Sequence, residues 1–134
     1  MAKLDTIEGI GPALSEKFAQ AGITTCEALL QAGGRRDGRT ELAGKAGLSE
    51  ARILKLVNCA DLMRVRGVGS EYSELLEAAG IDSVPELAQR NARNLADKMA
   101  EVNKAKKLVR SVPSAKVVEK WVAHAKTLPR AVHH

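Results

Sequence analysis

The stretch that decides the fold is "IEGIGPALSEKFAQAGI", residues 7–23, in which Gly9 and Gly11 flank a single isoleucine. Two glycines around one apolar residue allow the backbone a positive φ and a tight turn. Pro12 follows, and proline suits the first turn of a helix, where its missing N–H has no intrahelical role. The stretch therefore predicts a tight turn that leads directly into a helix.

The same pattern recurs 58 residues later as "VRGVGSEYSELLEAAGI", residues 65–81. When the comparison is extended to residues 32 and 90, identical residues stand at Gly9/Gly67, Gly11/Gly69, Ser15/Ser73, Glu16/Glu74, Ala21/Ala79, Gly22/Gly80, Ile23/Ile81, Leu29/Leu87 and Gln31/Gln89. We interpret this similarity as an internal duplication, with repeats at about residues 4–61 and 62–112.

Each copy has the pattern of short helices separated by glycine. Gly22 and Gly80 stand where a left-handed C-terminal cap is expected, each followed by an isoleucine that can make the apolar contact of that cap. The patterns Thr24-x-x-Glu27 and Ser83-x-x-Glu86 predict capping boxes that open the next helix.

Further signals divide the rest of the chain. Ser49 predicts the start of a long helix that runs to about Arg64, and "GGRRDGR", residues 33–39, predicts a loop. Pro113 predicts a break, after which Ser114 opens a last helix over about 114–128, with Val118, Trp121, Ala125 and Leu128 on one face. No convincing strand is found, so we predict a single all-α domain over residues 1–134 with a C-terminal capping helix.

Composition bounds the class of protein. The chain has 134 residues and an ordinary apolar content of 45%, enough for one hydrophobic core. Its apolar runs fall short of the roughly 20 residues of a membrane span, and the N-terminus has no signal-peptide core, so we expect a cytoplasmic protein. Cys26 and Cys59 make neither a disulfide framework nor a zinc set, and we assign no function to His133 and His134.

The net charge of +5 is unevenly distributed. Residues 1–89 hold 10 Lys/Arg against 13 Asp/Glu, whereas residues 90–134 hold 11 against 3, so the excess positive charge lies in the last third. A basic face favours contact with a polyanion, and a solvated helix surface has the same composition. Both interpretations stay open for "KAKKLVR", residues 104–110, which as a helix would present Lys104, Lys107 and Arg110 on one side.

The two glycine turns also suit an anion. If Ile10 and Val68 point inward, the amide N–H groups of each turn face outward, and the following helix directs its positive dipole end the same way. A phosphate oxygen is the natural ligand of such a site. The same glycines are equally needed for the turn alone, so the pattern is more specific for fold than for function.

Both glycine stretches resemble helix-hairpin-helix motifs, and the two together resemble the double helix-hairpin-helix, SAM-like domains of DNA-repair proteins. "AGITTCEALL" and "AGIDSVPELA" are similar to the C-terminal domain of the RNA polymerase alpha subunit. As a whole, residues 4–128 resemble a bacterial helix-hairpin-helix family of unknown function. The resemblance implies sequence-independent binding to DNA backbones through amides around Gly9–Ile10–Gly11 and Gly67–Val68–Gly69.

Charged residues near the turns support this implication in part. Candidate cations for phosphates are Arg64 and Arg66 at the second turn, Arg35, Arg36 and Arg39 in the glycine-rich segment, and Lys104, Lys107 and Arg110. DNA-binding copies of the motif commonly carry a lysine or arginine where this chain has Ala13 and Glu71, and Glu8 stands beside the first turn. These departures predict that the first turn binds phosphate less well than the second.

Catalysis finds little support. "GIGPAL" lacks the third glycine and the preceding strand of a dinucleotide fingerprint. Helix-hairpin-helix glycosylases keep an aspartate at a fixed distance beyond the hairpin, and here Asp82 falls too early and Asp97 too late. No catalytic triad, carboxylate pair or metal-ligand set emerges, so we expect no enzyme activity, no cofactor, no metal and no small-molecule substrate.

Two functions remain as hypotheses. The first is a non-enzymatic, sequence-independent binder of duplex DNA, with structured RNA as an open alternative ligand. The second is a protein-interaction or self-association module that keeps the fold without DNA binding, which the acidic residues 1–89 favour. No membrane role is expected.

Overall fold

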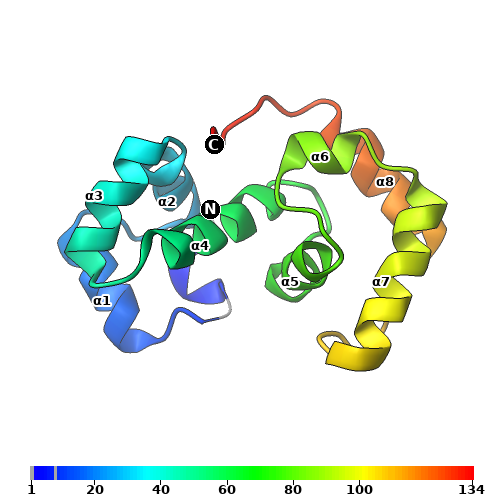
Figure 1. Cartoon of the computed structure of the whole chain (residues 1–134), viewed down its shortest axis with the longest axis horizontal. Coiled ribbons are helices and arrows are strands. Elements are labelled where there is room, and N and C mark those ends of the chain that lie inside the picture. The colour runs from blue at the N-terminus through cyan, green and yellow to red at the C-terminus, as the bar shows by residue number, and fades with distance from the viewer. Residues whose placement is uncertain (1, 8) are drawn as a thin grey trace. The chain divides into compact units, whose positions relative to one another are not determined.

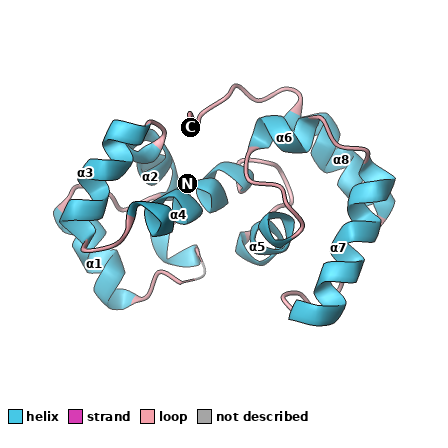
Figure 2. Ribbon diagram, viewed as in Figure 1, coloured by secondary structure: helices cyan, strands magenta, loops and turns pink. Residues whose placement is uncertain are grey.

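The computed structural model describes residues 2–7 and 9–134, and this part of the chain contains helices and loops but no β-strand (Figures 1 and 2). The all-α prediction is therefore confirmed. One isolated bridge joins Lys3 to Thr25. The helical elements are the 3₁₀ turn η1 (Leu4–Thr6) and α1 (Pro12–Gln20), α2 (Cys26–Gly33), α3 (Arg36–Ala46), α4 (Glu50–Leu62), α5 (Ser70–Ala78), α6 (Val84–Ala88), α7 (Ala92–Lys106) and α8 (Ala115–Ala125).

The chain divides into two compact units. Unit 1 comprises Met1–Asp61 together with Ala131–His134, and unit 2 comprises Leu62–Arg130. The boundary between them falls in the last turn of α4. Unit 1 thus contains α1 to α3 and nearly all of α4, and unit 2 contains α5 to α8.

The core of unit 1 forms where α1 and α2 pack against α3. Its fully buried side chains include Leu4, Ile7, Phe18, Leu29 and Ile53. Burying side chains of this size contributes about 1.5–3 kcal/mol each. Ser49 opens α4 as predicted, because its hydroxyl accepts a hydrogen bond from the Arg52 amide at 3.1 Å, although the helix ends two residues earlier than expected.

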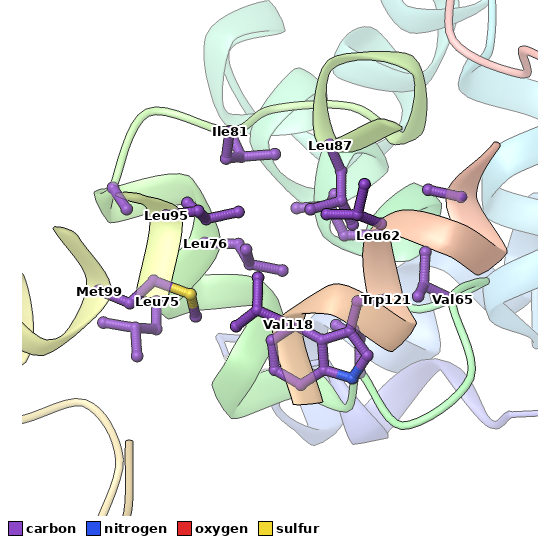
Figure 3. Close-up of a cluster of buried hydrophobic side chains, with 14 of the residues drawn as sticks. Leu62, Val65, Leu75, Leu76, Ile81, Leu87, Leu95, Met99, Val118 and Trp121 are labelled. Atoms are coloured by element: carbon purple, nitrogen blue, oxygen red, sulfur yellow. The ribbon is translucent and has the colours of Figure 1, made fainter. Parts of the chain in front are cut away.

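The core of unit 2 forms where α7 and α6 pack against α8 and where α5 packs against α7. Figure 3 shows its central side chains, among them Leu75, Met99, Val118 and Trp121. Trp121, which the sequence places on the same helix face as Val118 and Ala125, belongs to this core, since only 2% of its surface is exposed. Its ring lies 5.2 Å from that of Tyr72 at a tilted angle of 56°, a favoured arrangement for aromatic pairs.

The predicted glycine caps are present at the ends of α1 and α5. Gly22 and Gly80 have φ values of +82° and +98°. The amide of Ile23 donates to the carbonyl of Phe18 at 2.9 Å, and that of Ile81 donates to Leu76 at the same distance. Both isoleucines are buried, so each cap closes with the expected apolar contact.

Several local predictions need correction. The cap of α2 is Thr25 rather than Thr24, because the Thr25 hydroxyl accepts the Ala28 amide at 3.1 Å. Ser83 does cap α6, and Ser114 caps α8, which ends at Ala125 rather than near residue 128. The predicted loop 33–39 is much shorter, because α2 continues to Gly33 and α3 begins at Arg36.

The segment 104–110 does not form the continuous helix that would place its cations on one side. The helix α7 ends at Lys106, and Lys107 takes a left-handed conformation with φ of +51°. The Asn103 side chain accepts the amides of Leu108 and Val109 at 2.8 and 3.0 Å and donates to the Val109 carbonyl at 3.0 Å. These bonds replace the next helical turn, so Lys104, Lys107 and Arg110 do not share a helix face.

Two further findings concern membranes and thiols. In residues 2–7 and 9–134, no helix combines the length and apolar character required to cross a bilayer. Both cysteines are free thiols, with Cys26 buried and Cys59 partly buried. Burial raises the pKa of Cys26, and a hydrogen bond with Thr6 opposes that rise.

Candidate nucleic-acid interface

The two glycine turns, residues 7–11 and 65–69, have the same local geometry. Gly9 and Gly67 adopt φ of +93° and +91°. The amides of Ile10 and Val68 donate to the carbonyls three residues before them, at 3.1 and 3.0 Å. Ile10 and Val68 are each 5% exposed, so an inward apolar side chain anchors each turn as expected.

The second glycine of each turn has no structural reason to be glycine. Gly11 and Gly69 have φ of −87° and −93° with extended ψ, a conformation that any residue adopts. A Cβ atom built on either residue meets no other atom within 4 Å. Both residues are exposed and occupy the N-cap position, where Ser, Thr, Asp or Asn would stabilise the helix at least as well. Glycine at both positions leaves open space beside the helix start.

The open space at Gly11 and Gly69 adjoins the starts of α1 and α5. The N-cap residue of each helix is a glycine, which has no side chain that could cap the helix. The N-terminus of a helix also carries the positive end of the helix dipole. Backbone amides at these helix starts can therefore donate hydrogen bonds to an anion that approaches the backbone closely.

Arg52 adds a cation to the first turn that the sequence did not reveal. Its guanidinium lies over Gly9, with Nη2 3.4 Å from the Gly9 carbonyl oxygen and 2.7 Å from the place a Cβ atom would take. Arg52 is exposed at the start of α4, 43 residues from Gly9. The first turn therefore has a nearby positive charge even though Ala13 stands where a basic residue was sought. Glu8 lies outside the described residues.

The second turn is held in place by α8. The indole Nε1 of Trp121 lies 3.1 Å from the place of a Cβ atom on Gly67. The backbone amide of Arg66 donates to Nδ1 of His124 at 2.9 Å, which requires that this nitrogen carry no proton. His124 is partly buried and supports the turn.

The two arginines predicted at the second turn differ in their surroundings. Arg66 is exposed, whereas Arg64 is partly buried and donates to the Pro129 carbonyl at 2.7 Å. Arg66 is thus the better placed of the two to contact an external phosphate. Glu71, in the first turn of α5, is also exposed and opposes an anion there.

The predicted cations of unit 1 lie apart from the first turn. Arg35 and Arg36 are exposed at the start of α3, which Figure 1 shows well separated from the turn that precedes α1. Arg39 is 5% exposed and donates to the carbonyls of Gly33, Gly34 and His133, so its predicted access to a ligand is wrong.

The basic segment after α7 approaches the second turn through one contact. The Tyr72 hydroxyl donates to the carbonyl of Ser111 at 3.1 Å, which ties the loop carrying Arg110 to the first turn of α5. Lys104, Lys107 and Arg110 are exposed. Unit 2 holds 13 Lys/Arg against 8 Asp/Glu, whereas unit 1 holds 8 of each, so the net positive charge belongs to unit 2.

A groove of about 530 Å³ lies beside the first turn in unit 1, lined by Asp5, Ile10, Pro12, Ser15, Glu16 and Ala19. Its two carboxylates make it acidic. Among the described residues, no group of three or more His, Cys, Asp or Glu side chains is placed to hold a metal ion.

Comparison with known proteins identifies the family of this chain. A family model described as a domain of unknown function (DUF4332) matches residues 8–128. No curated protein and no solved structure matches the chain significantly.

Proposed function

We propose that this chain, which belongs to the DUF4332 family of domains of unknown function, is a tandem helix-hairpin-helix protein that binds duplex DNA without reading its sequence and without catalysing a reaction. The duplication is supported by the nine-residue helices α1 and α5, which begin 58 positions apart after turns of equal geometry. In this proposal each turn holds one phosphate of the DNA backbone.

The observation that carries the proposal is the pair of open glycines, Gly11 and Gly69. A residue with ordinary φ and free space around it does not need to be glycine for its backbone conformation or its packing. Both copies nevertheless have glycine at the start of the helix. Close approach of another molecule to the backbone explains this choice, and a phosphate is a group that the N-terminus of a helix favours.

Each turn has its own nearby cation to attract a phosphate. Arg52 supplies a cation at the first turn, and Arg66 supplies one at the second. The exposed residues Lys104, Lys107 and Arg110 extend the positive surface of unit 2. Few phosphates are neutralised in this arrangement, so we expect a dissociation constant of about 1–100 μM at physiological salt, as for non-specific binding in general.

The test is a salt titration of binding to a random-sequence duplex, followed by fluorescence anisotropy of labelled DNA. The logarithm of affinity should fall linearly with the logarithm of salt concentration. Arg52→Gln should reduce this slope by about 0.9, the value for one lost phosphate contact. Lys17→Gln, an equal loss of charge in the last turn of α1, should leave the slope unchanged. A flat salt dependence of the wild-type protein, or no binding at low salt, refutes DNA binding.

A second pair of variants tests the open glycines. Gly69→Ala should weaken DNA binding about tenfold or more, because a hydrogen bond to a charged group contributes about 1.5–3 kcal/mol and the added methyl group blocks the phosphate. Gly44→Ala is the matched control, since Gly44 is exposed in α3 and its added Cβ also meets nothing within 4 Å. Equal affinities of the two variants would remove the observation on which the proposal depends.

The acidic groove beside the first turn favours a second candidate function, the binding of a basic protein segment. Asp5 and Glu16 line this groove and would attract cationic side chains. Capture of a partner from nuclease-treated lysate by the wild-type protein, lost in an Asp5→Lys/Glu16→Lys variant, would support this function. Capture that disappears with nuclease treatment would return the choice to DNA.

A further inference from the structure

The corner between α2 and α3 in unit 1 binds the last four residues of the chain. We call this corner, formed by Gly33, Gly34 and Arg39, the α2–α3 corner. The segment Ala131–His134 belongs to unit 1, although the residues directly before it belong to unit 2. Sequence analysis gave residues 133 and 134 no role, and the structure differs from that expectation.

Two hydrogen bonds to main-chain atoms of His133 hold the segment. The His133 amide donates to the Gly34 carbonyl at 2.7 Å, and Nη2 of Arg39 donates to the His133 carbonyl at 2.9 Å. The other guanidinium nitrogen, Nη1, donates to the carbonyls of Gly33 and Gly34 at 3.0 and 3.2 Å. A buried arginine is tolerated only when it is well hydrogen-bonded, so the segment completes the environment of Arg39.

Gly34 is an independent sign that the corner is built for this segment. Its φ and ψ of −64° and −28° are ordinary helical values that any residue adopts. A Cβ atom on Gly34, however, would lie 2.5 Å from the carbonyl oxygen of Ala131. The glycine is therefore required by the close approach of the segment rather than by its own conformation.

The segment contributes one buried side chain. Val132 is 0% exposed, whereas His133 and His134 are exposed. Full burial of a valine contributes about 1.5–3 kcal/mol. The corner thus recognises an extended backbone and one small aliphatic side chain, and it makes little use of the flanking side chains.

We propose that the α2–α3 corner is a peptide-binding site that accepts residues 131–134 of a second copy of this chain in exchange for its own. The chain passes from unit 2 to unit 1 between Arg130 and Ala131. Just before this point, the Pro129 carbonyl accepts a hydrogen bond from Arg64 within unit 2. A segment that completes a neighbouring unit makes the same bonds when it comes from another molecule, which is the basis of domain swapping.

Exchange competes with the chain's own segment. Tethered segments act at effective concentrations of about millimolar, so the wild-type protein should form dimers only as its concentration approaches that range. Removing the competing segment should therefore uncover the site at much lower concentrations.

Two full-length variants separate the corner from the segment. Val132→Asp disables the segment and leaves the corner empty, whereas Gly34→Val blocks the corner and leaves the segment free. Each should be monomeric alone by light scattering, and an equimolar mixture should form a 1:1 complex. Val112→Asp is the control, because it makes the same substitution at a valine that is 40% exposed. Its own segment still occupies its corner, so a mixture of Val112→Asp with Gly34→Val should give no complex. A mixture that stays monomeric overturns the proposal.

A peptide measurement covers the case in which Gly34→Val fails to fold. A fluorescent peptide with the sequence of residues 126–134 should bind the Val132→Asp protein at least tenfold more tightly than the wild-type protein, whose corner is occupied. The same peptide with aspartate in place of the valine should not bind. Equal affinity for both proteins, or no binding to Val132→Asp, overturns the proposal, and neither result depends on DNA.

Discussion

Alanine at Gly67 should destabilise the protein, whereas alanine at Gly69 should leave its stability nearly unchanged, although the two glycines belong to the same turn. Gly67 has a left-handed φ of +91°, and its added Cβ would lie 3.1 Å from Nε1 of Trp121, a ring that is 2% exposed and has little room to move. Gly69 has an ordinary φ of −93°, and its added Cβ meets nothing within 4 Å. The pair therefore distinguishes a glycine that the backbone conformation requires from a glycine that only leaves space free.

The magnitudes follow from these geometries. A left-handed conformation costs a residue with a Cβ atom about 1–2 kcal/mol, and the contact with Trp121 adds to this cost. Any glycine-to-alanine change also restricts the unfolded chain, which stabilises the protein by about 0.4–1 kcal/mol. At Gly69 this gain is offset by the weaker N-cap that alanine provides. We expect Gly67→Ala to lower the free energy of unfolding by about 1–2 kcal/mol and Gly69→Ala to change it by less than about 0.5 kcal/mol.

Differential scanning calorimetry measures the outcome. For a domain of 60–100 residues, 1 kcal/mol corresponds to a shift in Tm of about 4–8 °C, so Gly67→Ala should melt at least about 4 °C below the wild-type protein. Gly69→Ala should melt within about 2–3 °C of it. If both variants lose the same stability, the folded structure requires glycine at position 69, and the open space there is no sign of a ligand.

Two further predictions concern unit 1. Thr25→Ala should lower the free energy of unfolding by about 1 kcal/mol in urea denaturation, because it removes the cap of α2, whereas Thr24→Ala should leave it nearly unchanged; the reverse order would restore the capping box read from the sequence. Burial raises the pKa of Cys26, so less of it is thiolate at pH 8 and its alkylation should be slower than that of the partly buried Cys59, as peptide mapping by mass spectrometry can show. Faster alkylation of Cys26 would contradict its burial.

Sequence patterns were most informative where the determinants are local and occur twice. Gly22 and Gly80 could be predicted as caps because a left-handed residue after a helix is a property of a few adjacent positions. The repeat also indicates the correct N-cap of α2, because the same 58-residue offset pairs Thr25 with Ser83, the N-cap of α6. A single capping-box pattern, taken without that pairing, placed the cap one residue too early.

Predictions failed where distant residues decide the local structure. Arg39 looked like an exposed cation in a loop, but hydrogen bonds to Gly33, Gly34 and the distant His133 bury it. The end of α7 depends on the Asn103 side chain, which no charge pattern reveals. Arg52 reaches the first turn from 43 residues away, so nothing in the local sequence around Gly9 could show a cation there. A folded arrangement is needed to find each of these contacts.

The position of Trp121 gives the protein an optical reporter for one of its two units. It is the only tryptophan in the sequence, and it lies in unit 2 against the turn that contains Gly67. Its fluorescence emission should be at the short wavelength of a buried indole in the native protein, and it should shift to longer wavelength only when unit 2 unfolds. Melting of unit 1 would leave that emission unchanged while reducing the helical circular dichroism. The two signals, recorded in one experiment without any label, therefore distinguish which unit a ligand or a substitution stabilises.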